Sequence, residues 1–118
     1  MKIATTLIAQ GDCLFVRVDG VPADAVRVET PGPLVVAHSE TGHDHVVESA
    51  GVQMYHAKHD PLSSYLLLGD AAVHGIDIVH RRAWDTHETV RLLGTPGDAW
   101  LVRRQREWTP EGWRRVED

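Results

Sequence analysis

The segment HSETGHDHVVE, residues 38–48, places three histidines within eight positions. If residues 43–47 form a strand, His43 and His45 point to the same side, because side chains alternate along a strand. Two imidazoles at this spacing can converge on one metal ion, so the pair is typical of two nitrogen ligands. Glu48 comes three residues after His45 and falls on the opposite face. The pair therefore predicts half of a metal site, whose other ligands must come from elsewhere in the chain.

Two later histidines are the best candidates to complete that site. His80 ends the segment HGIDIVH, in which every second residue is apolar or histidine, and His87 opens the segment HETVRLL. We therefore predict that His43, His45, His80 and His87 bind one divalent metal ion. Three or four nitrogen ligands favour Zn²⁺, with Fe²⁺, Ni²⁺ and Mn²⁺ as alternatives.

Carboxylates near the histidine pair could add acid/base chemistry. A metal ion with an open coordination position could activate water or polarise an oxygen-containing ligand, as in a metal-dependent hydrolase or oxygenase. Glu40 and Glu48 flank the pair and are the predicted proton acceptors. Metal binding alone does not imply turnover, so the sequence leaves open whether the chain is an enzyme. The remaining histidines are interpreted as surface or hydrogen-bonded residues: His38, His56, His59 and His74.

The elements that must position these residues are short strands. Apolar and polar residues alternate in short segments that Gly, Pro, Asp and Ser separate, a pattern typical of an all-β domain. The predicted strands cover residues 13–18, 33–38, 45–49, 52–57, 64–69, 71–80, 88–93 and 98–108, and residues 49–51 predict a hairpin turn. So many strands in 118 residues indicate one domain, residues 1–118, built as a closed β-barrel or a two-sheet sandwich. Residues 81–93 could form one helical turn at most.

Composition and charge narrow the class of protein. Cys13 is the only cysteine, which excludes an internal disulfide, favours a cytoplasmic location and suggests packing as a small apolar residue. The sequence shows no signal peptide and no apolar run that could span a membrane. The net charge is −5, and residues 1–80 hold four Lys and Arg against ten Asp and Glu, which argues against nucleic-acid binding.

Two resemblances follow from these motifs. The segments GHDHVVE and GTPGDAW resemble the cupin superfamily, which implies a small β-barrel that binds a divalent metal through an H-x-H strand, a carboxylate and a later histidine. The chain is more closely similar to a family of small bacterial and phage proteins of unassigned function. That likeness rests on QGD at residues 10–12, SETGHDH at 39–45, His80, HET at 87–89 and RQREWTP at 104–110. It implies that these segments act as a set.

Other interpretations compete with the metal site. In one, SETGHDH forms a tight turn and the histidine pair is merely solvated. In another, the chain is a non-catalytic accessory module of a phage or mobile element, whose histidine-rich face contacts a partner or responds to pH. The weakest alternative is RNA binding through the Arg- and Trp-rich segment at residues 102–116. The ligand could be a small molecule or a protein, and the apolar strands could also pair with a second copy.

Overall fold

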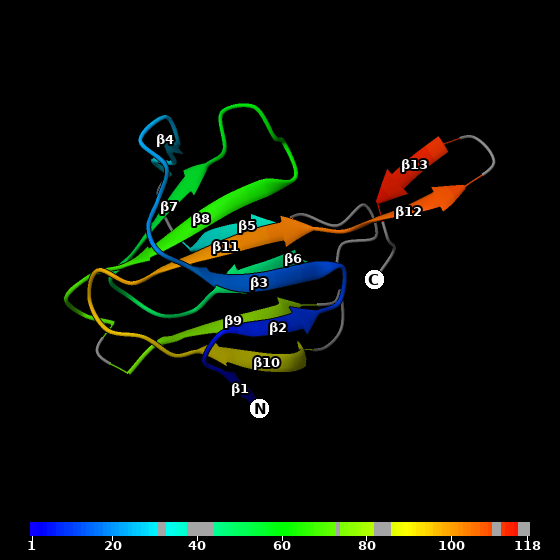
Figure 1. Ribbon diagram of the computed structural model, residues 1–118. Helices are drawn as coiled ribbons and strands as arrows, with labels where there is room; N and C mark the ends of the chain where they lie inside the picture. Colours follow the sequence, from blue (N-terminus) through cyan, green and yellow to red (C-terminus); the bar gives the residue numbers. More distant parts are fainter. Residues whose placement is uncertain (31–32, 38–43, 73, 82–85, 110–111, 116–118) are drawn as a thin grey trace.

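The chain folds into two β-sheets that enclose one apolar core (Figure 1). The structure, a computed structural model, describes residues 1–30, 33–37, 44–72, 74–81, 86–109 and 112–115. Sheet A contains, in spatial order, β1 (Lys2–Ala4), β10 (Thr86–Leu92), β9 (Ile76–Arg81), β6 (Asp44–Val47) and β5 (Leu34–Ala37). Sheet B contains β2 (Leu7–Gln10), β3 (Cys13–Val18), β11 (Ala99–Arg104), β8 (Ser63–Leu68), β7 (Val52–His56) and β4 (Val26–Arg27). Of the two predicted architectures, the sandwich is confirmed.

A separate hairpin follows the sandwich. Strands β12 (Arg106–Thr109) and β13 (Gly112–Arg115) pair only with each other and project from the body of the protein (Figure 1). The segment considered for RNA binding therefore includes the end of β11 and this hairpin. The described residues contain no helix that could span a membrane.

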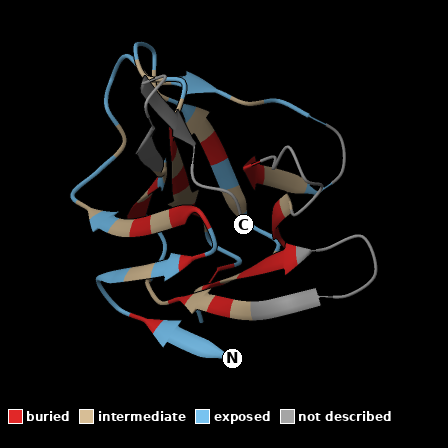
Figure 2. Cartoon of the chain, turned by 90° about the vertical axis from the view of Figure 1, so that its right-hand side faces the viewer, coloured by how far each residue is buried: buried red, intermediate tan, exposed pale blue. Residues whose placement is uncertain are grey.

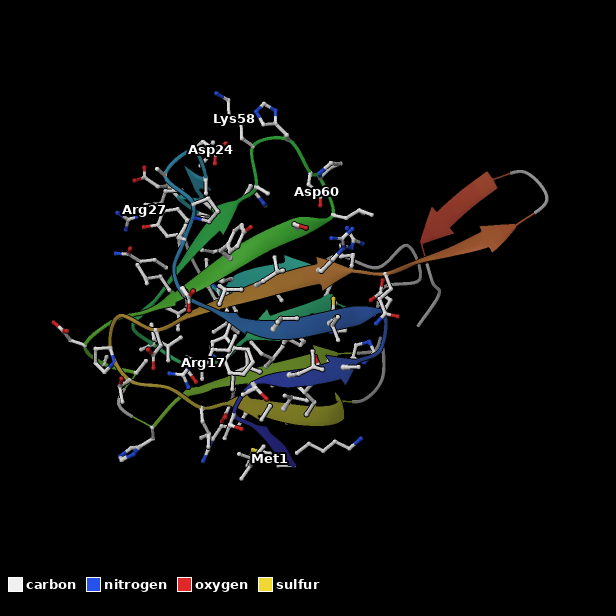
Figure 3. All side chains as sticks on the ribbon, viewed as in Figure 1. Met1, Arg17, Asp24, Arg27, Lys58 and Asp60 are labelled. Carbon is white, nitrogen blue, oxygen red and sulfur yellow. The ribbon has the colours of Figure 1, made fainter. Side chains whose placement is uncertain are left out.

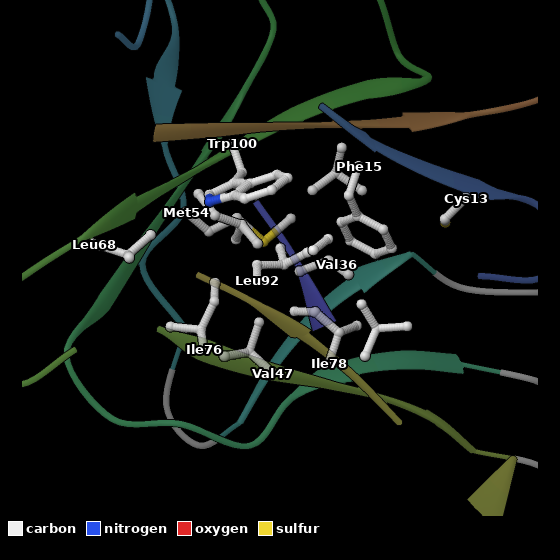
Figure 4. Close-up of a cluster of buried hydrophobic side chains, with 14 of the residues drawn as sticks. Cys13, Phe15, Val36, Val47, Met54, Leu68, Ile76, Ile78, Leu92 and Trp100 are labelled. Carbon is white, nitrogen blue, oxygen red and sulfur yellow. The ribbon is translucent and has the colours of Figure 1, made fainter. Parts of the chain in front are cut away.

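The core is built from the inner faces of both sheets, as strand alternation dictates. Trp100 and Val102 of β11 are buried on the face that meets Ile76 and Ile78 of β9, whereas Arg103 is exposed. In Figure 4 the cluster runs from Leu68 at one side to Cys13 at the other. Figure 2 shows the same alternation of buried and exposed positions, and it shows that β1 is mostly exposed.

Five connections carry the chain from one sheet to the other, and three of them lie close together: those between β6 and β7, β8 and β9, and β10 and β11. The predicted hairpin at residues 49–51 is therefore wrong, because β6 belongs to sheet A and β7 to sheet B. Gly51 has a φ of 76°, and an added Cβ would lie 2.6 Å from Cβ of Ala71. The connections bond to one another, since N of Gly69 donates to O of Gly51 at 2.6 Å and N of Gly97 to O of Leu68 at 2.7 Å. We call this side of the sandwich the crossing end.

The opposite side, which we call the polar end, lies on the right in Figure 1. There β3 and β8 begin and β9 and β11 end. The residues that define it are buried: Gln10, Asp12, Cys13, His45 and His80.

Each predicted strand overlaps a strand of the structure, but several elements were not foreseen. Strands β1, β2, β4 and β13 lie outside the predicted segments, and the segment 98–108 divides into β11 and β12. Where a helical turn was considered, residues 86–92 form β10, and residues 82–85 lie outside the described residues.

Candidate metal centre

Strand register brings three of the predicted histidines into one row across sheet A. His45 of β6 lies opposite His80 of β9, and His87 of β10 lies opposite His80 on its other side. The register of β10 shifts between His87 and Val90, which marks a bulge next to the row. His43 and Glu40 lie outside the described residues.

The rings of His45 and His80 stack on each other inside the sandwich. Their centroids are 4.2 Å apart and their planes differ by 9°. Both residues are at most 1% exposed. Directly opposed side chains on one sheet face lie close enough for such contact, so the stack follows from the register.

Gln10 fixes the orientation of the His45 ring. Nε2 of Gln10 donates to the carbonyl oxygen of Ile78 at 2.9 Å, which turns the amide oxygen of Gln10 towards His45. That oxygen lies 2.8 Å from Nδ1 of His45. Because an amide oxygen can only accept, Nδ1 must carry the proton. In a neutral ring, the lone pair therefore sits on Nε2.

Nε2 of His45 faces two further atoms that could bind a metal ion. One comes from the turn after Gln10, and the other from the first residue of the strand that follows. Oδ1 of Asp12 lies 3.0 Å from Nε2, and Sγ of Cys13 donates to the same oxygen at 3.8 Å. Gly11, with a φ of 55°, makes the turn between β2 and β3 that brings these side chains inward. Asp12 is 3% exposed and Cys13 is fully buried.

The three donor atoms form a group with the dimensions of a metal site. A ring nitrogen of His45, an oxygen of Asp12 and Sγ of Cys13 all lie within 4.8 Å of one another. Around a tetrahedral zinc ion, with bonds of about 2.0–2.3 Å, neighbouring ligand atoms are about 3.3–3.8 Å apart. Small side-chain movements would thus close the group on an ion. The bond from Nδ1 of His45 to Gln10 matches the second-shell contact that orients metal-binding histidines.

The stacked rings limit how His80 could take part. A metal ion bound by an imidazole nitrogen lies close to the plane of that ring. The planes of His45 and His80 are almost parallel, so an ion bound in the plane of one ring lies well out of the plane of the other. Coordination by both residues would require one ring to turn. The predicted set of four histidines therefore stays a prediction.

The remaining histidines and carboxylates considered above lie away from this group or outside the described residues. Glu48 is exposed, and its backbone N donates to the carbonyl oxygen of Asp77 at 3.0 Å. His56, His59 and His74 are exposed, and Nδ1 of His56 lies 3.3 Å from Oγ of Ser64. His38 is outside the described residues.

Sequence reasoning missed Gln10, Asp12 and Cys13 as site residues. QGD was considered as part of a family resemblance, and Cys13 was interpreted as a packing residue. In the structure QGD forms the turn between β2 and β3, and the side chains of Gln10 and Asp12 point into the sandwich. One signal in the sequence could have found them. QGD occurs together with the histidine motifs in the family that the chain resembles, which suggested that these distant segments act together.

Comparison with known proteins identifies a family. Residues 9–105 match the family described as Domain of unknown function (DUF8820), and the chain therefore belongs to that family. No curated protein and no solved structure matches the chain. The matched segment contains Gln10, Asp12, Cys13, His45 and His80.

Proposed function

We propose that this DUF8820 domain binds one divalent metal ion at the polar end, through Nε2 of His45, a carboxylate oxygen of Asp12 and Sγ of Cys13. The observation that carries the proposal is the convergence of these three buried donor atoms, within 4.8 Å of one another. A buried carboxylate is costly unless it has a strong partner, and a metal ion is such a partner.

The chemistry of the donors favours particular ions. A thiolate, an imidazole and a carboxylate together suit Zn²⁺, and Fe²⁺ and Ni²⁺ are alternatives, whereas a thiolate is a poor ligand for Mn²⁺. The contact between Nε2 of His45 and Oδ1 of Asp12, at 3.0 Å, requires a shared proton. A bound ion would replace that proton and the thiol proton of Cys13, so metal affinity should rise with pH.

Other residues of the original prediction could complete the site. His80 and His87 lie in the same row as His45, and His43, outside the described residues, precedes it by two positions in the sequence. A fourth ligand from this set would close the coordination sphere, whereas water there would leave an open position for chemistry. Glu40, which lies outside the described residues, remains the proposed proton acceptor in that second case, whereas the exposed Glu48 lies away from the group.

Metal analysis of protein purified without a histidine tag tests the proposal. After incubation with Zn²⁺ and dialysis, we expect about one zinc per chain. The variant His45→Ala should lose the metal, and His74→Ala should keep it, because His74 is an exposed histidine away from the polar end. An unchanged zinc content in His45→Ala, or no retained zinc in the wild type, would contradict the proposal.

Cobalt substitution tests the thiolate separately. Co²⁺ bound to a thiolate gives an intense charge-transfer band in the near ultraviolet, which imidazole and carboxylate ligands do not give. The band should be present in the wild type and absent in Cys13→Ala. A band that persists in Cys13→Ala would exclude Cys13 as a ligand, since no other cysteine is present.

The stacked pair supports a second candidate, a response to pH. Charging both His45 and His80 would place two positive rings with centroids 4.2 Å apart inside the protein. Such like charges repel strongly in a buried site. Acid should therefore loosen the polar end, and His80→Gln should weaken that response. An identical acid transition in wild type and His80→Gln, followed by tryptophan fluorescence, would exclude this role for the pair.

A further inference from the structure

A pocket of about 400 Å³ opens between the two sheets, beside the candidate metal centre. β5 of sheet A forms one wall, and β7, the start of β8 and the segment after β4 form the other. Most of its lining residues are apolar, with Leu34, Val36 and Met54 among them, but polar atoms make up about half of the wall surface. Its volume is that of a small-molecule site.

One side chain gives the pocket its charge. Of the described residues that line it, Arg104 alone is permanently charged, and none is acidic. Arg104 follows Trp100 and Val102 on the inner face of β11, so strand alternation directs it inward. A guanidinium has five N–H donors and can bind a carboxylate with two of them while it keeps its other contacts. The pocket thus combines apolar lining residues with one site for an anion.

The pocket and the metal-binding group are direct neighbours in both sheets. Arg104 lies opposite Cys13 in the pairing of β11 with β3. Ala37, another lining residue, lies opposite His45 in the pairing of β5 with β6. Directly opposed residues have Cβ atoms about 4.5–5.5 Å apart. A ligand held by Arg104 would therefore rest against the strands that carry His45 and Cys13.

We propose that this pocket binds a small carboxylate with an apolar body, such as a medium-chain fatty acid. The carboxylate contacts Arg104, and the apolar body lies along Leu34, Val36 and Met54. Charge complementarity selects the carboxylate over a neutral molecule of the same shape. The pocket needs no metal ion, so this proposal goes beyond the proposed function and does not depend on it.

Calorimetric titration of the metal-free protein with octanoate, and with 1-octanol as the uncharged counterpart, tests the proposal. Wild type should bind octanoate at least about tenfold more tightly than 1-octanol, because the charged hydrogen bonds are available only to the acid. The variant Arg104→Gln should reduce octanoate affinity by about tenfold or more and leave 1-octanol unchanged. Arg103→Gln is the matched control, since Arg103 is the adjacent residue on the exposed face. It should bind both compounds like the wild type.

A second pair of variants tests the pocket without touching its charged residue. Thr30 is an exposed lining residue, whereas its neighbour Glu29 is exposed but does not line the pocket. Thr30→Trp should therefore weaken both octanoate and 1-octanol, and Glu29→Trp should weaken neither.

The proposal fails if octanoate does not bind the wild type at millimolar concentration, or if 1-octanol binds as tightly as octanoate. It also fails if Arg103→Gln and Arg104→Gln weaken binding equally, or if Thr30→Trp binds like the wild type. Should Arg104→Gln not fold, the octanoate and 1-octanol comparison in the wild type and the Thr30 and Glu29 variants still decide the matter. Because every titration uses metal-free protein, a failure to bind zinc leaves these outcomes unaffected.

Discussion

The two ends of the sandwich use the same strand alternation to bury opposite kinds of residue. Towards the crossing end, inward positions hold apolar side chains such as Leu68, Ile76 and Leu92, each at most 1% exposed. At the polar end the equivalent inward positions hold His45 and His80, with Gln10 and Asp12 beside them. Strand geometry decides which residues face inward, whereas residue type decides what those positions can do.

The two ends also differ in how much their buried residues contribute to the stability of the fold. Apolar burial contributes stability directly, at about 25 cal/mol per Å² removed from water. A hydrogen-bonded polar group contributes only about 0.5–1.5 kcal/mol net, and a buried charged pair is often no better than apolar residues of the same shape. A polar cluster such as that of Gln10, Asp12 and His45 is therefore a poor way to stabilise a core. Ligand binding gives a better reason for it than stability does.

The largest predicted effect is at the crossing end. The substitution Leu92→Ala leaves a cavity at a fully buried position and should lower the free energy of unfolding by about 2–5 kcal/mol. Urea denaturation followed by tryptophan fluorescence measures the change. Ile3→Ala is the control, since Ile3 is 60% exposed and the same loss of side chain should cost much less. Zinc affinity of folded Leu92→Ala should equal that of the wild type, and a large loss of affinity would contradict the separation of the two ends.

Zinc should stabilise the protein through the polar end. With free Zn²⁺ at 100 times its Kd, the free energy of unfolding should rise by about 2.7 kcal/mol. Urea denaturation in zinc buffer and in chelator measures the difference. The gain should be absent in His45→Ala and complete in His74→Ala. Equal gains in both variants would place the ion elsewhere in the chain.

The difference between the ends also explains what the sequence could predict about the fold. The apolar run at residues 13–18 located β3, in which Cys13 and Phe15 are buried. Alternation missed β1 and β2, whose residues are mostly exposed. It gave the wrong partner for β6, because a Gly-containing turn looks the same whether it joins neighbouring strands or crosses between sheets. Pairing depends on contacts between distant residues, which local pattern does not contain.

The candidate site was predictable only in part for the same reason. Strand spacing assigned His45 and His80 to one predicted site, and the structure puts their rings in contact. It could not show that the turn at QGD folds over the same end, since Asp12 and His45 are 33 residues apart. It also treated Cys13 alone, and an isolated cysteine in an apolar strand gives no sign of a nearby carboxylate.

A smaller effect should separate orientation from ligand binding at the polar end. Gln10→Ala removes the acceptor for Nδ1 of His45 and the donor to the carbonyl oxygen of Ile78. We expect a loss of about 1–3 kcal/mol in the free energy of unfolding and zinc binding that is weaker by about 10–100-fold. Urea denaturation and competition with a chromophoric chelator measure the two quantities. Gln53→Ala, at an exposed position, should change neither. If Gln10→Ala lost stability but kept full zinc affinity, Gln10 would be a structural residue only.

The smallest effect belongs to a surface contact at the crossing end. Oδ2 of Asp98 accepts hydrogen bonds from the backbone N of Thr95 at 2.8 Å and from Nη2 of Arg17 at 2.5 Å. Figure 3 shows Arg17 on this side of the protein. The backbone hydrogen bond from Thr95 is the main reason that the pKa of Asp98 lies below its usual range; desolvation opposes it, and the charge and hydrogen bond of Arg17 lower the pKa further.

A carboxyl whose pKa is lowered by folding stabilises the protein above its unfolded pKa, about 3.9 for Asp. That contribution disappears as the pH falls through the lower folded pKa, because the folded state must then take up a proton. Asp98→Asn should therefore be slightly less stable at neutral pH and should lose less stability than the wild type between pH about 4 and more acid values. Urea denaturation over this pH range measures both curves. Parallel curves would show that Asp98 does not contribute, and zinc affinity at neutral pH should be unchanged, because the contact is at the end opposite the metal-binding group.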